Sequence, residues 1–316
     1  MTVSRASLLL PASALLVALG RSRRRRLQAE RILRISRVVS DLDRAEAFYR
    51  DGLRFRVIAQ GHSDHGTLAA LGVGDIGAVE VVMRLGAQEI ALVQFARRGR
   101  PYPRDSRCDD LWFQHLAIVV NDMDLAYAHL SSHAGWCPIS EGGPQLLPPS
   151  SGAVRAFKFR DPDGHPLELI WFPPGQGRAV WHQKVSGALF LGVDHSALSV
   201  ASTPRSLAFY RALGLQESGR SLNRDPAQER LDGVSGARVR VTSLRPVSAA
   251  SPGLELLSYR PPGRTAGMIF PNDLVTDWVT LAVRPSPNIS SCAIQDPDGH
   301  RLILVDQGAG AMRLPA

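Results

Sequence analysis

The sequence Arg-Ala-Glu-Ala-Phe-Tyr-Arg-Asp-Gly-Leu at residues 44 to 53 has a near copy, Arg-Ser-Leu-Ala-Phe-Tyr-Arg-Ala-Leu-Gly-Leu, at residues 205 to 215. The two Phe-Tyr pairs are 161 residues apart, about half of the 316-residue chain. A second phrase, Asp-Pro-Asp-Gly-His, occurs at 161 to 165 and at 296 to 300, each time directly before an apolar run. These repeats indicate a chain built from duplicated units.

Four strand-like segments begin the repeated units, at steps of 81, 80 and 83 residues. They are Arg34 to Ser40, His115 to Asn121, His195 to Ala201 and Trp278 to Arg284. We therefore expect four modules, at residues 30–97, 108–175, 188–262 and 272–308, with links at 98–107 and 173–185. Module 4 is short, because residues 285–290 leave no room for a helix between two strands.

Each of the first three modules reads as a strand, an amphipathic helix and further strands. In module 1, Ala45, Phe48, Tyr49 and Leu53 recur at helical spacing, and strand-like runs follow at 79–83 and 90–95. The predicted fold class is α+β, with tandem βαβββ modules and a fourth module that lacks its helix.

Four polar residues stand out at equivalent places in modules 2 and 3. His115 and His195 open their modules, while Glu168 and Glu255 lie in apolar runs near the module ends. The equivalent places in modules 1 and 4 hold Arg34, Ala91, Trp278 and Ile303. A carboxylate inside an apolar strand is costly to bury unless it meets a cation, so we interpret the four residues as ligands of one divalent metal. The alternative is that each is satisfied separately by hydrogen bonds.

The chain resembles the vicinal oxygen chelate superfamily, which includes glyoxalase I, extradiol dioxygenases and bleomycin-resistance proteins. The resemblance rests on Val39 to Tyr49, the two Asp-Pro-Asp-Gly-His turns, Leu167 to Ile170 and Leu254 to Leu257, and it spans residues 32 to 307. It implies that modules pair into cupped sheets. It also implies that the metal ligands come from the first strand, usually His, and from the last, usually Glu.

Module pairing decides whether the four residues meet. If modules 2 and 3 pair, one cup receives both imidazoles and both carboxylates, and modules 1 and 4 form a companion cup without ligands. Pairing of 1 with 2 and 3 with 4 would leave two half-sites. A homodimer that joins half-sites is the remaining arrangement. We favour pairing of modules 2 and 3.

Two His and two carboxylates suit Zn²⁺, Ni²⁺, Fe²⁺, Mn²⁺ or Co²⁺, and the sequence does not choose among them. The resemblance implies glyoxalase-like proton transfer on a small substrate with vicinal oxygens, with Glu168 or Glu255 as the base. The alternatives are an extradiol ring-cleaving dioxygenase and a resistance protein that binds a drug or metabolite without catalysis. Tyr259 shares a strand face with Glu255, so it is a candidate substrate contact, with packing in the core or at the rim of the cup as the alternative.

The first 29 residues form a separate segment. Residues 6 to 20 are mostly apolar and precede an Arg-rich run, and six Arg with no acid give residues 1–29 a charge of +6 out of the +8 of the whole chain. The rest of the chain is therefore near neutral, which argues against nucleic-acid binding. Because the charge follows the apolar stretch, an export signal is not expected, and we place the segment outside the fold.

The three cysteines, an odd number without metal-site spacing, favour a reducing compartment. We expect a cytoplasmic monomer or homodimer without stable membrane insertion, with organelle targeting or membrane tethering by residues 1–29 as the alternative.

Overall fold

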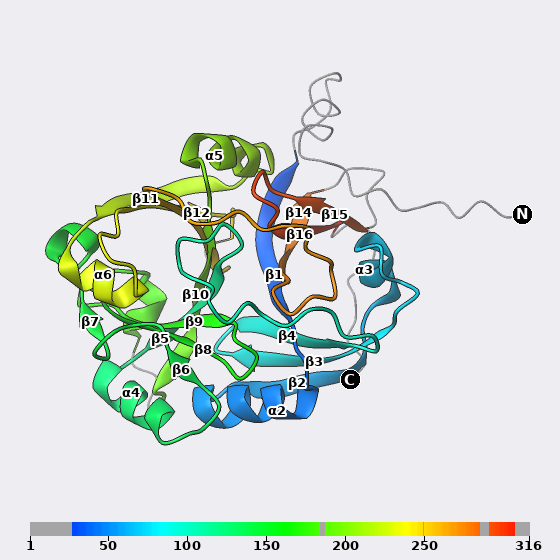
Figure 1. The fold of residues 1–316 in the computed structure, drawn as a ribbon, viewed down its shortest axis with the longest axis horizontal. Coiled ribbons are helices and arrows are strands. Elements are labelled where there is room, and N and C mark those ends of the chain that lie inside the picture. Colours follow the sequence, from blue (N-terminus) through cyan, green and yellow to red (C-terminus); the bar gives the residue numbers. More distant parts are fainter. Residues whose placement is uncertain (1–26, 184–186, 249, 285–290, 307–316) are drawn as a thin grey trace, which may run out of the picture.

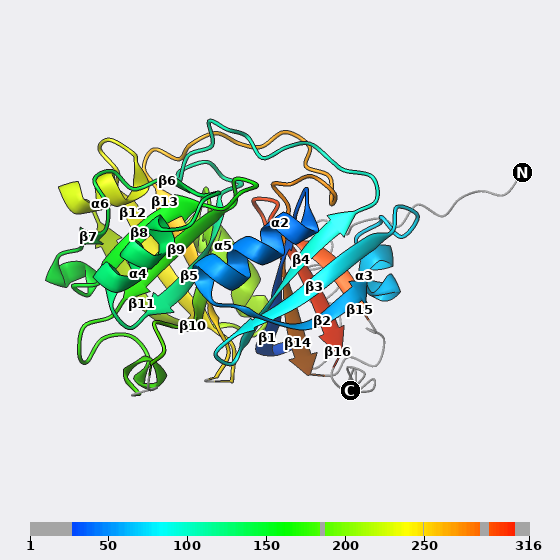
Figure 2. The same cartoon turned by 90° about the horizontal axis from the view of Figure 1, so that it is seen from below.

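Two curved mixed β-sheets lie next to each other and account for most of the chain (Figures 1 and 2). The computed structural model describes residues 27–183, 187–248, 250–284 and 291–306. One sheet has nine strands and the other has seven. Each sheet is built from strands of two modules, so the repeat observed in the sequence is also the unit of the architecture.

The nine-stranded sheet combines modules 2 and 3, and we call its concave face the central cup. Its order is β11-β12-β13-β10-β5-β9-β8-β6, and β7 pairs with β8. The strands are β5 (Gln114–Val120), β6 (Cys137–Pro138), β7 (Gln145–Leu146), β8 (Arg155–Arg160), β9 (Pro166–Trp171), β10 (Phe190–Ser199), β11 (Gln216–Asn223), β12 (Val239–Arg245) and β13 (Gly253–Tyr259). The first strands of the two modules, β5 and β10, pair antiparallel. The predicted pairing of modules 2 and 3 is confirmed.

The seven-stranded sheet combines modules 1 and 4, and its concave face is the companion cup. Its order is β15-β16-β14-β1-β4-β3-β2. The strands are β1 (Gln28–Val38), β2 (Arg56–His62), β3 (Ala78–Leu85), β4 (Gln88–Phe95), β14 (Asp277–Arg284), β15 (Ser291–Gln295) and β16 (Arg301–Asp306). The described residues of module 4 form three strands and no helix, in agreement with its predicted truncation.

Three helices follow the first strands of modules 1 to 3, as the repeat predicts. They are α2 (Leu42–Ala47), which continues as a π-helical turn over Phe48–Gly52, α4 (Met123–Ser131) and α5 (Thr203–Ala212). Asp41 and Asp122 cap α2 and α4 by accepting hydrogen bonds from backbone N–H groups of the first turn. The buried faces of all three helices join a single hydrophobic core with the convex faces of both sheets.

Short helices that the repeat does not predict precede the penultimate strand of modules 1 to 3. They are α3 (His65–Ala70), a 3₁₀ turn at Pro149–Ser151 and α6 (Pro226–Asp232), and a further 3₁₀ turn covers Ala179–His182 in the link between the halves. In module 1, α3 places Leu68 in the companion cup, next to Trp278 and Ile303. The companion cup is therefore filled with hydrophobic side chains. Arg34 forms an ion pair with Glu80 at 3.3 Å.

The boundary predicted for the first segment is two residues too late. Strand β1 begins at Gln28, and Ala29 is fully buried and pairs with Val283 of β14. Residues 28 and 29 therefore belong to the fold and not to the leader. Residues 1–26 lie outside the described residues. Within the described part of the chain, no helix is both long and apolar enough to cross a membrane.

The two Asp-Pro-Asp-Gly-His turns attach each even-numbered module to the helix of the module before it. Tyr49 donates a hydrogen bond to Asp161 at 3.0 Å, and Tyr210 donates to Asp296 at 3.1 Å. The third residue of the first turn, Asp163, accepts a hydrogen bond from the backbone N–H of Ser40, which lies just before the same helix. The first turn joins modules 1 and 2, which lie in different sheets, so it fastens the two sheets together.

The histidine of each turn has a structural role. His165 is fully buried and hydrogen-bonds the Asp161 carboxylate through Nδ1 at 3.1 Å. His300 lies 2.9 Å from the carbonyl oxygen of Ser199. The first contact closes the turn on itself, and the second fixes the turn against β10 of the neighbouring module.

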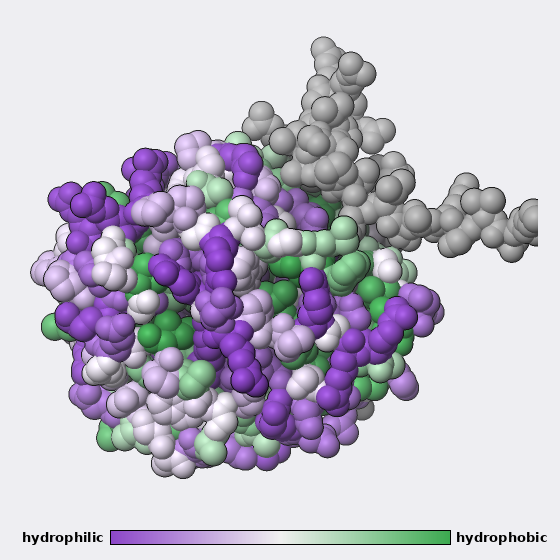
Figure 3. All heavy atoms as spheres, in the orientation of Figure 1, coloured by the Kyte–Doolittle hydropathy of each residue, from purple (hydrophilic) through white to green (hydrophobic). Residues whose placement is uncertain are grey.

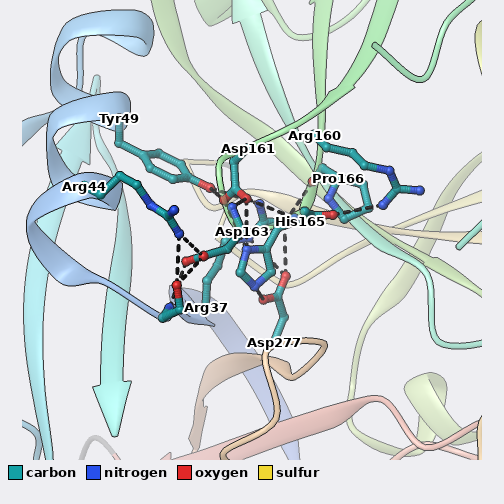
Figure 4. A network of polar contacts seen from close by, with 11 residues as sticks. Arg37, Arg44, Tyr49, Arg160, Asp161, Asp163, His165, Pro166 and Asp277 are labelled. Atoms are coloured by element: carbon teal, nitrogen blue, oxygen red, sulfur yellow. Dashed lines mark hydrogen bonds and ion pairs between the residues drawn. The ribbon is translucent and has the colours of Figure 1, made fainter. Parts of the chain in front are cut away.

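A buried arginine completes the junction between the sheets (Figure 4). Arg37 is fully buried and donates to Asp277 at 3.1 Å, to the Tyr49 hydroxyl at 3.0 Å and to the carbonyl oxygen of Pro166 at 3.0 Å. Burial alone would raise the pKa of Asp161, but His165 and Arg37 lower it to about 2. The junction is therefore a charged network without access to solvent.

Removal of one charge from this network should destabilise the fold strongly. We expect Asp277→Ala to lower the free energy of unfolding by about 3 to 5 kcal/mol, because Arg37 would keep its charge in a buried place without its carboxylate. Arg44→Ala, which removes a half-exposed ion pair with Asp163 in the same region, should cost less than about 1 kcal/mol. Urea denaturation of both variants measures the difference, and equal losses would contradict this account of the junction.

Candidate metal centre

The four candidate ligands occupy two adjacent rows that cross the central cup. In one row, Glu168 is the neighbour of Ala117, and Ala117 is the neighbour of His195. In the other, His115 is the neighbour of Ala197, and Ala197 is the neighbour of Glu255. The two rows are related by the approximate two-fold symmetry of the modules. Each alanine leaves space between a histidine and a glutamate, so that their longer side chains can converge above it.

Three pairs of ligand atoms are close enough to share one ion. Nε2 of His115 lies 2.9 Å from Oε2 of Glu168, and Nε2 of His195 lies 3.8 Å from that same oxygen. Oε2 of Glu255 lies 3.4 Å from Nε2 of His195. Two atoms that each bind an ion at about 2.1 Å cannot be more than about 4.2 Å apart. All three separations meet this limit.

His115, Glu168 and His195 form the tightest part of the group. Suitable ligand atoms of these three buried side chains all lie within 4.8 Å of one another. Glu255 stands slightly apart, with 21 % of its side chain exposed and its other oxygen, Oε1, accepting a 2.7 Å hydrogen bond from Ser243. The central cup is therefore open on the side of Glu255.

Two buried ring nitrogens without hydrogen-bond partners in the described part of the chain indicate that a further group binds at the centre. Nε2 of His115 and Nε2 of His195 are buried and have no hydrogen-bond partner among the described residues, although carboxylate oxygens lie nearby. Buried polar atoms are normally satisfied. Two neutral imidazoles and two carboxylates around a divalent cation would also balance the charge. The residues present fit a divalent metal ion.

A β-bulge supplies a partner for His195 that the sequence analysis missed. The register between β10 and β5 shifts between Val193 and His195, and a bulge of this kind can turn two successive side chains to one face. Asp194 lies 3.1 Å from Nδ1 of His195 and accepts a 2.7 Å hydrogen bond from Trp181. An imidazole that donates from Nδ1 to a carboxylate presents Nε2 to a metal. The local sequence shows only that Asp194 precedes His195. The bulge that can turn both side chains to one face depends on the pairing of β10 with β5.

The protonation states follow from burial and from the neighbouring charges. Burial favours the neutral form of His195, but Glu255, Asp194 and Glu168 outweigh it and raise its pKa to about 9. Burial lowers the pKa of His115. For Glu168, burial is outweighed by His115, Lys158 and His195, which lower its pKa to about 2. Without metal, the proton of the centre is therefore held on His195.

Tyr259, which the sequence suggested as a substrate contact, lies in a buried polar cluster of the central cup. Its hydroxyl donates to Asp232 at 2.9 Å, and Lys158 also donates to that carboxylate at 2.6 Å. Lys158 is the cross-strand neighbour of Glu168. The cluster joins α6 of module 3 to β8 of module 2. A substrate contact for Tyr259 stays a prediction.

A cavity of about 400 Å³ lies at the ends of β5 and β9, where Val119, Trp171 and Trp181 contribute to its walls. None of the four candidate ligands lines it. We therefore place access to the centre at the partly exposed Glu255. Figure 3 shows one face of the molecule, on which hydrophilic and hydrophobic side chains are interspersed.

Comparisons with known proteins agree with this architecture. Residues 31–169 match the model of the Glyoxalase/Bleomycin resistance protein/Dioxygenase superfamily. A mutant of glyoxalase I from Zea mays has 18 % sequence identity and a TM-score of 0.60, and the match covers 93 % of this chain and 96 % of that one. A "putative dioxygenase" from Bacillus subtilis has 13 % identity and a TM-score of 0.53, with 90 % and 87 % covered.

One curated relative is similar over a shorter stretch. The "Uncharacterized protein YaeR" of Escherichia coli is 41 % identical over 71 residues, which are 22 % of this chain and 50 % of the relative. The chain thus spans about half the length of this relative. The solved structures show the fold, and the family model supports the superfamily resemblance over residues 31–169.

Loss of either histidine should remove the same single ion. We expect His115→Ala and His195→Ala each to reduce bound metal from about one equivalent to less than about 0.2, because each removes a ligand from the tight group of three. His62→Ala, at an exposed position of the other sheet, serves as the matched control. Elemental analysis after dialysis measures the stoichiometry, and a loss of one half in each variant would indicate two independent sites.

Metal affinity should rise with pH up to about 9, which is the pKa of His195. Below that pH the imidazole is protonated, so the metal must displace a proton, and the apparent Kd should fall about tenfold per pH unit. Competition with a fluorescent chelator between pH 7 and pH 9 tests this. A flat profile over that range would show that the ion does not displace a proton from His195.

Proposed function

We propose, because residues 31–169 match the model of the Glyoxalase/Bleomycin resistance protein/Dioxygenase superfamily, that this protein is a divalent-metal-dependent enzyme. We further propose that it transfers a proton between neighbouring carbons of a small substrate with vicinal oxygens. The observation that carries the proposal is the convergence of two imidazoles and two carboxylates from modules 2 and 3 in one cup, where three nitrogen–oxygen pairs are separated by 2.9 to 3.8 Å.

In this proposal, His115, Glu168 and His195 hold the ion, and Glu255 completes the ligand set when no substrate is bound. A bound divalent ion would act as a Lewis acid that polarises a substrate carbonyl and lowers the pKa of the C–H group on the adjacent carbon. Its identity is open among Zn²⁺, Ni²⁺, Fe²⁺, Mn²⁺ and Co²⁺.

Glu255 is the better candidate for the base than Glu168. Glu168 is buried, has a pKa of about 2 and lies between the two imidazoles, which suits a permanent ligand. Glu255 is partly exposed and faces the opening of the cup. It would take the proton from the substrate carbon next to the carbonyl and return it to the neighbouring carbon. Ser243 would hold one of its oxygens in place through the 2.7 Å hydrogen bond.

A ring-cleaving dioxygenase is the second candidate, and one observation favours it. The tight group consists of two histidines and one carboxylate, which is the ligand set typical of non-haem Fe²⁺ oxygenases. The presence of Glu255 argues against this alternative, because its carboxylate would occupy a coordination position that an oxygenase keeps open. A non-catalytic binding protein is the third candidate, and it predicts no requirement for metal.

Glu255→Gln should separate these functions. For proton transfer, we expect the variant to retain its metal and to lose at least about 100-fold in the rate of solvent deuterium incorporation into 2-oxoaldehyde hemithioacetals or α-hydroxyketones. The amide keeps the shape of the side chain but cannot accept the proton. Ser258→Ala, on the opposite face of β13, is the control. Oxygen consumption with catechols that survives in Glu255→Gln would instead support the dioxygenase.

A further inference from the structure

Arg245 reaches towards the candidate metal centre from the edge of the central cup. It follows Leu244, the neighbour of Leu254, so the antiparallel register places it opposite Gly253, which is itself the neighbour of His195. Because glycine has no side chain, the guanidinium can lie across it. A Cβ atom on Gly253 would be 3.3 Å from Nη1 of Arg245.

The guanidinium of Arg245 is poorly satisfied where it lies. Nη1 is buried and has no hydrogen-bond partner among the described residues. Nη2 reaches Asp194 only at 3.4 to 3.5 Å, and that carboxylate is already engaged by His195 and Trp181 at shorter distances. The side chain is 27 % exposed. An arginine that is partly exposed and has unused donors can bind a further acceptor.

A second guanidinium lies close by. Arg178 is about half buried, stacks on Trp181 at 5.1 Å and donates to the carbonyl oxygen of Ser251 at 3.1 Å. Burial and the charge of Arg245 both lower the pKa of Arg178, while Asp194 opposes them. The two guanidiniums therefore share one nearby carboxylate. Since the ligand set and a divalent ion would together be neutral, the edge of the cup next to His195 carries positive charge.

We propose that Arg245, supported by Arg178, binds an anionic group of the substrate, either a carboxylate or a phosphate-type group, beside the metal centre. The inference rests on the proposed function, because it places the anion on the same molecule whose vicinal oxygens meet the metal. A planar guanidinium donates two parallel hydrogen bonds to either kind of anion. The substrate class is thus a small acid with vicinal oxygens, and neutral compounds should bind less tightly.

Three probes with the same chelating unit test the proposal in the full chain loaded with Co²⁺. Catechol carries no further charge, 3,4-dihydroxybenzoate adds a carboxylate, and 3,4-dihydroxyphenylphosphonate adds a phosphonate. Titration of the Co²⁺ absorption bands gives a Kd for each probe without any need for turnover. We expect at least one charged probe to bind about tenfold or more tightly than catechol.

Arg245→Met should abolish that preference and leave the affinity for catechol within about twofold, because charge-assisted hydrogen bonds are lost while the ligand set remains. Arg178→Met should reduce the preference in part. Arg240→Met, on the same strand but exposed on the opposite face, should change nothing. Whichever charged probe loses more affinity in Arg245→Met identifies the anion as a carboxylate or as a phosphate-type group.

The outcomes separate the two hypotheses. If catechol shifts the Co²⁺ bands but the charged probes bind no better, the metal centre stands and the anion site is refuted. An Arg245→Met variant that binds all three probes as the wild type does, or loses affinity for all three equally, also refutes it. If catechol produces no spectral change in the wild type, the proposed function itself fails, and the inference fails with it.

Discussion

The antiparallel register of β5 against β10 is the constraint on which the candidate site depends. It places His195 beside Ala117 and His115 beside Ala197, so both imidazoles rise from one face with room between them. Because side chains alternate along a strand, a slip of one residue would turn one histidine towards the hydrophobic core. The parallel partners β9 and β13 then carry the two glutamates into the same rows. The position of each ligand therefore follows from backbone pairing and not from flexible loops.

The two cups show how one repeated framework can hold different interiors. Trp278 and Ile303 occupy in module 4 the places that His115 and Glu168 occupy in module 2, and they belong to the hydrophobic filling of the companion cup. The seven-stranded sheet also contributes to the junction, from its other face, through Arg37 and Asp277, whose equivalents in the other half are Leu198 and Gln114. One pair of modules thus provides the chemical groups, and the other provides a packed support fastened to it by buried charges.

The sequence was sufficient for features that repeat or alternate. The recurrence of Phe-Tyr and Asp-Pro-Asp-Gly-His predicted the modules, and the distribution of His115, Glu168, His195 and Glu255 predicted which modules share a sheet. It was insufficient where a role depends on a partner distant in the chain. Asp194 serves His195 because of a bulge defined by β5, Arg245 depends on the absence of a side chain at Gly253, and His165 has its partners in a closed network. Such features appear only when neighbouring strands are known.

The nested pairing of the modules, with 2 and 3 inside 1 and 4, also has a consequence during synthesis on the ribosome. The central cup can close as soon as β13 has emerged, because all its strands lie within residues 114–259. One edge of β1, by contrast, has its partner in β14 and waits until residue 284 has been made. An open strand edge is prone to pair with another nascent chain. Module 1 is thus synthesised first, but its sheet is completed last. It is most exposed to misassembly in the interval before β14 has been made.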